Sequence, residues 1–346
     1  MKTNLLTRDD FRNAVFSRDG HRCVFCQKPA KDAHHIIERR LWKDGGYHLN
    51  NGASVCEEHH ILCEQTKISV EQIREACKIS KPIIPEHLYS DERYDKWGNI
   101  ILENGQRLKG ELFFDESVQK VLKDSLDLFT DKVKYPRTHH LPWSENMNED
   151  DRLMDSTQLF VGKRVIVTEK MDGENTSFYK DYVHARSINS KNHPTRDWVK
   201  NFWSSIAGEI PDGWRICGEN LWGKHSIYYI NLPSFFMGFS IWNERNECLS
   251  WDETQEWFKL LNIVSVPVLY DGIWDESKIK GLYRDNQWEF HEGYVIRIAD
   301  KFSYSEFRKV VGKFVRKNHI QTTKHWMHGQ AIERNHMEEK CIRMIP

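Results

Sequence analysis

A lysine followed by an aspartate and a glycine is the feature of this sequence most suited to covalent chemistry. Residues 169–175, EKMDGEN, directly follow the β-branched run VIVT at 165–168, which predicts a strand. Lys170 is therefore placed at a strand end, where a desolvated pocket or a nearby cation such as a metal would let its amine act as a nucleophile. The alternative is a solvated turn lysine, because the pattern K-x-D-G also occurs by chance.

Cysteines and histidines in the first sixty residues are spaced as metal ligands. Cys23 and Cys26 form one pair with two intervening residues, and Cys56 and His59 form a second. Two such pairs can close a tetrahedral Zn²⁺ site, because each pair sits on one tight turn. Cys63 is an alternative to His59 as the fourth ligand, and free buried thiols are the alternative to zinc.

Composition limits the classes of protein that fit. The chain has 346 residues, of which 39% are apolar, enough for two domains with their own cores. The formal net charge is −1, so any basic surface for nucleic acid must be local. No apolar run of about 18 residues and no apolar signal core occur, and we expect a cytoplasmic monomer that does not bind membranes. Eight cysteines in a chain of this length favour metal ligands and free thiols over disulfides.

Five further motifs follow Lys170 in a fixed order. They are HARS at 184–187, CGEN at 217–220, FFMGFS at 235–240, FHEGYVIR at 290–297 and VGKFVRK at 311–317. With residues 169–175, this series resembles the motifs of the covalent nucleotidyltransferases, which include ATP-dependent DNA and RNA ligases and mRNA capping enzymes. Glu169 and Asn175 make it most similar to the RNA ligase 2 branch.

The resemblance implies a role for each motif. Lys170 would attack the α-phosphorus of ATP and hold AMP as a phosphoramidate, and Glu169 would belong to the nucleotide site. Arg186 would contact a phosphate, for which a guanidinium is well shaped. Glu219 would accept hydrogen bonds from the ribose hydroxyls. Phe239 would stack on adenine, although Ser240 stands where the family often has Asp.

The last two motifs would bind metal and phosphate. Glu292 would hold the Mg²⁺ or Mn²⁺ that accompanies ATP, and Lys313 would reach the α-phosphate. The family pattern is K-x-K, but Val315 occupies the second lysine position here. Arg316 or Lys317 would then substitute.

The residues around the N-terminal cysteine pairs resemble the HNH nucleases, whose ββα-metal fold often contains such a zinc. In that resemblance His35 is the general base, His34 and His60 hold one catalytic metal ion, and Asn51 orients the loop that carries the histidines. Many members have Asp where this chain has His34, which favours a softer ion. The alternative is a zinc module that binds nucleic acid without cutting it.

The predicted architecture is α+β with four segments. Residues 1–80 form an HNH-like zinc domain, 81–135 a structured connector without chemistry, 136–317 the adenylyltransferase domain, and 318–346 a basic tail suited to phosphate contact. The adenylyltransferase domain is expected to be ATP-grasp-like, with two antiparallel sheets and ATP between them. About thirty residues follow residue 317, too few for the OB-fold of DNA ligases and capping enzymes, so we expect no C-terminal OB-fold.

These features together predict an ATP-dependent RNA ligase that works in RNA repair. Its partner would be RNA with 5′-phosphate and 3′-OH ends, with DNA as an alternative strand, and its cofactors ATP, Mg²⁺ or Mn²⁺, and Zn²⁺. Two other classes stay open: an HNH nuclease with a degenerate ligase domain, and a nucleic-acid-binding protein without catalysis.

Overall fold

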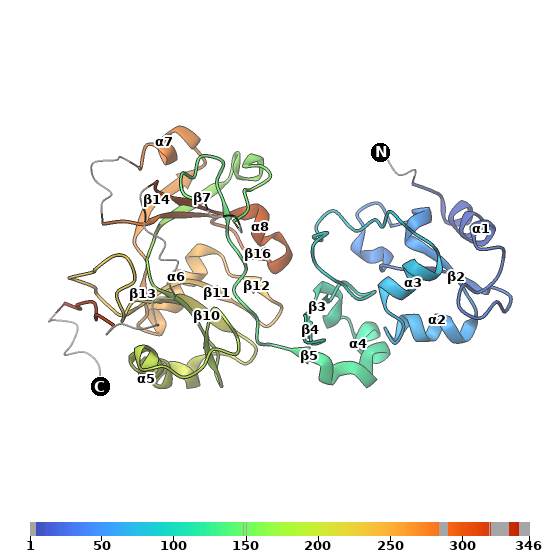
Figure 1. Ribbon diagram of the computed structural model, residues 1–346, viewed down its shortest axis with the longest axis horizontal. Coiled ribbons are helices and arrows are strands. Elements are labelled where there is room, and N and C mark those ends of the chain that lie inside the picture. Colours follow the sequence, from blue (N-terminus) through green and yellow to red (C-terminus); the bar gives the residue numbers. More distant parts are fainter. Residues whose placement is uncertain are drawn as a thin grey trace. The chain divides into compact units, whose positions relative to one another are not determined.

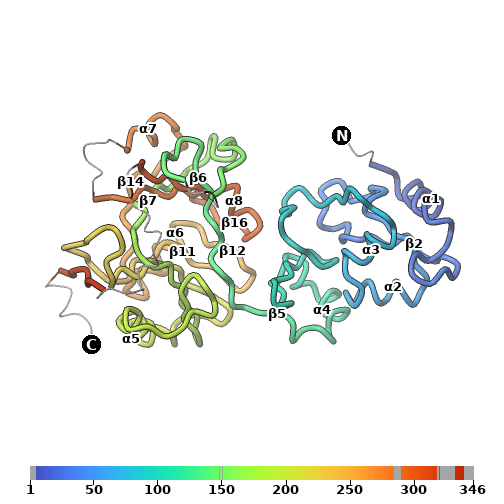
Figure 2. Tube along the Cα trace, viewed as in Figure 1, coloured from blue at the N-terminus to red at the C-terminus, as the bar shows by residue number. Residues whose placement is uncertain are grey.

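The computed structural model describes residues 5–147, 149, 151–283, 290–317, 319 and 332–338. The chain forms two compact units, Met1–Val133 and Lys134–Pro346, whose elements Figures 1 and 2 colour along the sequence. The first unit thus contains both the predicted segment 1–80 and nearly all of the predicted connector.

The first unit begins with a helix, a hairpin and a second helix. These elements are α1 (Arg8–Arg18), β1 (Asp32–His35), β2 (Gly52–Val55) and α2 (Glu57–Glu64), and α3 (Val70–Ala76) follows them. Strands β1 and β2 pair antiparallel, with His34 opposite Ala53. Because Cys56 is the N-cap of α2, the second predicted ligand pair lies where β2 passes into the helix.

The remainder of the first unit is a small three-stranded sheet with one helix. Its elements are β3 (Ile100–Ile101), β4 (Arg107–Leu108), α4 (Glu116–Leu122) and β5 (Phe129–Thr130). Strands β3 and β4 pair antiparallel across the 103–106 turn, and β5 adds to β4 in parallel. Trp97 packs with Val118 and Leu122 of α4, which anchors the 95–99 turn in this unit.

The second unit contains a five-stranded sheet with the order β14-β7-β15-β17-β6. The strands are β6 (His139–His140), β7 (Arg164–Lys170), β14 (Val268–Ile273), β15 (Gly293–Ile298) and β17 (Val311–Val315). The side chains of Val165 and Val167 enter one apolar core, whereas Ile166 enters another. Both faces of β7 are therefore buried, which explains why the run before Lys170 is continuously apolar rather than alternating.

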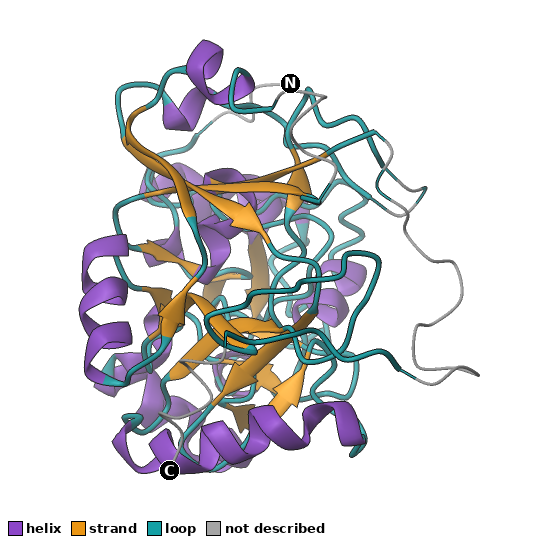
Figure 3. Ribbon diagram, turned by 90° about the vertical axis from the view of Figure 1, so that its left-hand side faces the viewer, coloured by secondary structure: helices purple, strands orange, loops and turns teal. Residues whose placement is uncertain are grey.

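A seven-stranded sheet lies in the same unit, with the order β16-β12-β11-β10-β8-β9 and β13 added to β11. Its strands are β8 (Glu174–Phe178), β9 (Val183–Ala185), β10 (Arg215–Asn220), β11 (Phe236–Trp242), β12 (Glu247–Cys248), β13 (Val264–Ser265) and β16 (Phe302–Ser303). Figure 3 distinguishes these strands from the helices. Two sheets in an α+β fold agree with the prediction, but the edge pairings β17–β6 and β11–β13 are parallel.

Helices cover this second sheet, and part of the tail packs nearby. Helices α5 (Asp197–Ile206) and α6 (Trp251–Leu260) contribute Val199 and Phe258 to one apolar core with strands β8, β10 and β11. Short helices α7 (Glu276–Lys280) and α8 (Phe307–Val310) complete the unit. Residues 332–338 pack against the loop after β10, and most of the predicted basic tail lies outside the described residues.

Within the described ranges, no helix has both the length and the hydropathy needed to span a bilayer.

Glu292 directly precedes Gly293, the first residue of β15, so the close pairing of β15 with β17 positions it. A Cβ atom on Gly293 would overlap the carbonyl oxygen of Phe314, which is backbone and cannot turn away. We predict that Gly293→Ala lowers the free energy of unfolding by about 3 kcal/mol, measured by urea denaturation. Gly208→Ala is the matched control, because nothing lies within 4 Å of the added atom. Equal urea midpoints for the two variants would contradict this packing.

Candidate functional site

Lys170 is the last residue of β7 and lies opposite Gly293 of β15. This register brings Glu292 beside it, and the Lys170 Nζ to Glu292 Oε2 distance is 2.7 Å. Burial disfavours the ammonium, but the carboxylates of Glu292 and Glu219 outweigh burial and raise the pKa of Lys170 above its ordinary value. In this state Lys170 is a protonated amine, which is not nucleophilic until a proton leaves.

Acidic side chains converge on the same strand end. Gly173 allows this approach, because a Cβ there would lie 2.9 Å from Glu219 Cγ and 2.6 Å from the Asn220 carbonyl oxygen. Burial raises the pKa of Glu219 to about 8; Lys170 opposes this increase, and neighbouring carboxylates add to it. Glu219 is thus largely protonated at neutral pH and can donate a hydrogen bond.

Asp172 differs from Glu219 because its charge is stabilised by hydrogen bonds. Although burial disfavours its carboxylate, hydrogen bonds from Ser226 and Ile227 lower the pKa of Asp172. The Ser226 Oγ, Ser226 N and Ile227 N donors lie 2.6, 2.8 and 2.8 Å from Asp172 Oδ2. One oxygen of Asp172 is therefore committed to the 226–227 backbone.

A cavity of about 810 Å³ opens above these residues, between the two sheets of the second unit. Its lining comes from both sheets and includes Lys170, Glu219, Phe239, Glu292 and Lys313. Phe239 lies edge-on to Tyr135, with ring centroids 5.2 Å apart. The cavity has the volume of a small-molecule site, and its wall combines aromatic rings with several charged groups.

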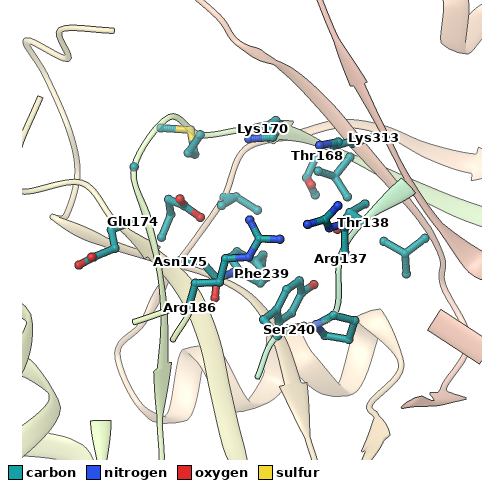
Figure 4. Close-up of a pocket in the computed structure, with 18 of the residues that line it drawn as sticks. Arg137, Thr138, Thr168, Lys170, Glu174, Asn175, Arg186, Phe239, Ser240 and Lys313 are labelled. Carbon is teal, nitrogen blue, oxygen red and sulfur yellow. The ribbon is translucent and has the colours of Figure 1, made fainter. Parts of the chain in front are cut away.

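Positive side chains occupy another part of the cavity wall. Figure 4 shows Lys170 and Lys313 near one another, with Arg137 and Arg186 directed toward the same space. Burial and the neighbouring Arg137 lower the pKa of Arg186. Burial also lowers the pKa of Lys313, whose Nζ lies 3.1 Å from Asp151 Oδ1. Cations crowded in this way favour an anion such as a polyphosphate.

Glu169 has a partner that the sequence did not indicate. Its Oε1 lies 2.7 Å from Nδ1 of His291, while Glu169 also lines the cavity. Asn175 lines the cavity too, and its side-chain oxygen is buried without a hydrogen-bond partner in the described structure. Asn175 therefore has a free acceptor for a ligand.

Three side chains beside Lys170 could hold a divalent cation. Asp172, Glu292 and His319 each offer a ligand atom, and these atoms lie within 4.8 Å of one another. Glu292 was predicted as a metal ligand, whereas Asp172 and His319 were not. Asp172 belongs to the K-x-D-G pattern and could have been chosen from it. His319 lies in no motif and is brought in by the chain after β17.

The predicted zinc ligands of the first unit come together. Cys23, Cys26, Cys56 and His59 offer ligand atoms within 4.8 Å of one another. The Cys56 Sγ to His59 Nδ1 distance is 3.2 Å, and Cys26 Sγ lies 3.7 Å from Cys56 Sγ. Cys63 is not a member of this group, and burial raises the pKa of its thiol to about 12.

The two histidines predicted to hold the HNH metal ion lie together, and His35, predicted as the general base, lies outside their group. His34 and His60 form a second group with Glu64, which was not predicted, and His35 is not in it. The His35 ring stacks on Phe11 with centroids 4.6 Å apart, and its Nε2 is buried without a hydrogen-bond partner among the described residues.

Asn51 holds the loop that carries these histidines. Its Oδ1 accepts from the Ile37 amide at 2.9 Å, and its Nδ2 donates to the Ile37 and Gly46 carbonyl oxygens at 3.0 and 3.1 Å. The side chain thus fixes the backbone just after β1.

Residues 163–315 match the family model described as RNA ligase. The matched stretch lies within the second unit and covers less than half of the chain. It contains Lys170, Arg186, Glu219, Glu292 and Lys313. The match supports the predicted resemblance of this unit to the RNA ligases and covers no residue of the first unit. No protein with a curated description matches the sequence.

Among solved structures, the chain is similar to an RNA ligase from Naegleria gruberi. A variant without ligand has 18% identity and a TM-score of 0.36, covering 54% of this chain and 62% of that chain. A variant with ATP and Mn has 18% identity and a TM-score of 0.36 over 54% and 60%. The structure with PPi has 20% identity and a TM-score of 0.37 over 53% and 61%. The chain therefore spans less than two thirds of these structures, and the function must be argued from the site itself.

The raised pKa of Glu219 predicts a pH-dependent stability. The ordinary pKa of this carboxyl is 4.5, and in the folded protein it is about 8. Between these two pH values the folded state keeps a proton that the unfolded state has released. The contribution of Glu219 to the free energy of unfolding therefore falls as pH rises. We predict that Glu219→Gln, which resembles the protonated acid, stabilises the protein at pH 8 by at most about 5 kcal/mol. The gain should vanish near pH 4, as measured by urea denaturation. A gain that is constant across this pH range would contradict the assigned protonation.

Proposed function

We propose that this protein is an ATP-dependent RNA ligase that works through a lysyl-AMP intermediate. The observation that carries the proposal is Lys170 at the end of β7, 2.7 Å from Glu292 and in the wall of an 810 Å³ cavity with Arg186, Glu219 and Lys313. An amine that can become a nucleophile, beside cations that can bind phosphates in one cavity, suits nucleotidyl transfer.

The first step joins AMP to the enzyme. The neutral Lys170 amine attacks the α-phosphorus of ATP, a P–N bond forms, and the bond to the departing pyrophosphate breaks. Lys313 and Arg186 stabilise negative charge on the phosphates, while Phe239 and Glu219 bind adenine and ribose. The free oxygen of Asn175 is a further acceptor for the nucleoside.

The second and third steps move AMP to RNA and release it. An oxygen of the 5′-phosphate attacks the lysyl-AMP phosphorus, which forms a phosphoanhydride and returns the amine of Lys170. The 3′-OH of the other end then attacks the 5′-phosphate, so that a phosphodiester forms and AMP leaves. Both ends must carry these groups for sealing.

A divalent ion fits the group Asp172, Glu292 and His319. Two carboxylates and an imidazole match the preferences of Mn²⁺, and the carboxylates also suit Mg²⁺. The positive charge of such an ion would weaken the attraction between the Glu292 carboxylate and the Lys170 ammonium, and so would lower the pKa of Lys170. Because Glu292 contacts Lys170 with one oxygen and faces His319 with the other, at 3.7 Å, it can link the two sites.

The Cys23, Cys26, Cys56 and His59 group fits a structural zinc ion. Three thiol sulfurs and one imidazole nitrogen form a common tetrahedral ligand set. The ion would tie the turn after α1 to the start of α2. We propose that this zinc module contacts the nucleic acid that the second unit seals.

Adenylylation of Lys170 is the direct test of the ligase proposal. Incubation with α-³²P-labelled ATP and Mg²⁺ or Mn²⁺ should place label on the protein, and Lys170→Ala should remove it. Lys163→Ala, at an exposed position just before the same strand, is the matched control and should keep the label. Absence of label on the wild-type chain would contradict the proposal. If the protein is labelled but does not seal a nicked RNA duplex, only the assignment of RNA as the substrate is contradicted.

The zinc proposal predicts about one zinc ion per chain, measured by atomic emission after dialysis. Cys56→Ser should lose the ion and lower the melting temperature, because the ion stabilises the folded state. Cys63→Ser should keep it, since Cys63 lies outside the ligand group. Equal zinc content in both variants would rule out this ligand set.

A further inference from the structure

The His34, His60 and Glu64 group has the donor set of a divalent metal site. Glu64 Oε1 lies 3.3 Å from His34 Nδ1 and 3.4 Å from His60 Nε2. These spacings suit ligands around one ion, and His34 is buried with neither ring nitrogen hydrogen-bonded in the described structure. Judged on these three residues alone, the group fits the metal that an HNH nuclease requires.

A fourth side chain, that of Lys96, reaches the same carboxylate. The ammonium of Lys96 lies 3.2 Å from the same Glu64 Oε1, and its side chain is only 3% exposed. Nζ also lies 3.2 Å from Glu38 Oε2, donates to the His35 carbonyl oxygen at 3.1 Å and is 5.0 Å from the centre of the Trp97 ring. The ammonium therefore has three oxygen partners and one aromatic face, all within the first unit.

The backbone around Lys96 holds the ammonium in place. The Lys96 carbonyl accepts from the Glu38 amide at 2.8 Å, and the Trp97 indole donates to the Glu64 carbonyl at 2.9 Å. Asp95 is buried and bonds Asn99 and Arg107 at 2.9 and 3.0 Å. Both neighbours of Lys96 are thus fixed, which holds the Lys96 backbone beside Glu38 and Glu64.

Charge makes the ammonium and a divalent ion alternatives. An ion ligated by Glu64 Oε1 at about 2.1 Å would lie at most about 5.3 Å from Nζ, given the 3.2 Å contact. Two cations at that distance in a buried site repel strongly. Lys170 can relieve such repulsion by turning into the cavity that it lines, whereas Lys96 is buried and does not line that cavity. Glu64 and Glu38 are the carboxylates that contact Lys96, whose ammonium neutralises one of their two charges. Asp32 also faces His60, through space and without contacting Lys96.

We infer that Lys96 is the built-in cation of the His34–His60–Glu64 group, so that this group does not take up a catalytic metal ion. Divalent-metal chemistry is then confined to the second unit. This inference does not depend on ligase activity, because it concerns only the occupancy of the first unit.

Counting bound Mn²⁺ on the full-length chain tests the inference. Free Mn²⁺ is measured by electron paramagnetic resonance during titration of wild type, Glu64→Gln and Glu292→Gln. We expect wild type and Glu64→Gln to bind the same number of ions and Glu292→Gln to bind fewer. Loss of a Mn²⁺ ion in Glu64→Gln, with zinc content unchanged, would overturn the inference.

Removal of the ammonium is the complementary test. Lys96→Met should allow the His34–His60–Glu64 group to bind Mn²⁺ at least about tenfold more tightly than it does in wild type. The double variant Lys96→Met, Glu64→Gln should lose this binding. Lys96→Arg keeps the charge and should create no site. A folded Lys96→Met chain, with its zinc retained, that gains no Mn²⁺ would contradict the inference. If Lys96→Met does not fold, the Glu64→Gln comparison decides alone.

Discussion

The chemistry that we propose for the second unit depends on one ion pair, the contact of the Lys170 ammonium with the Glu292 carboxylate. The pair forms because β7 and β15 are adjacent and in a register that places Lys170 opposite Gly293. It keeps the amine protonated and in position while the cavity is empty. Chemistry at Lys170 therefore requires an event that weakens this contact, and a cation beside Glu292 is the simplest one the site allows.

The two units use a lysine among carboxylates in opposite ways. Lys170 is 27% exposed and lies in the wall of a cavity, so a ligand can reach it. Lys96 is 3% exposed and surrounded by fixed partners, so its charge serves the fold. The same pair of residue types thus gives the nucleophile that we propose in one case and a buried internal cation in the other. Access from the cavity, rather than residue identity, separates the two.

Local patterns in the sequence predicted the strand before Lys170, the grouping of Cys23, Cys26, Cys56 and His59, and two sheets in the second unit. Each depends on residues close in sequence or on an ordered series of motifs. His319 and Lys96 could not be found in this way, because no local pattern sets them apart. His319 reaches Glu292 only through the chain after β17, and Lys96 reaches Glu64 only because the 95–99 turn packs on α2. The segment 81–135, predicted to carry no chemistry, supplies that lysine.

The measurement that tests the central claim most directly is the proton affinity of the Lys170 amine. The rate at which an amine-reactive reagent labels Lys170, followed by peptide mass spectrometry as a function of pH, gives this value without ATP or metal. We predict a midpoint above the ordinary 10.5 in wild type and a lower one in Glu292→Gln, because the carboxylate stabilises the ammonium. Equal midpoints in the two proteins would contradict the account.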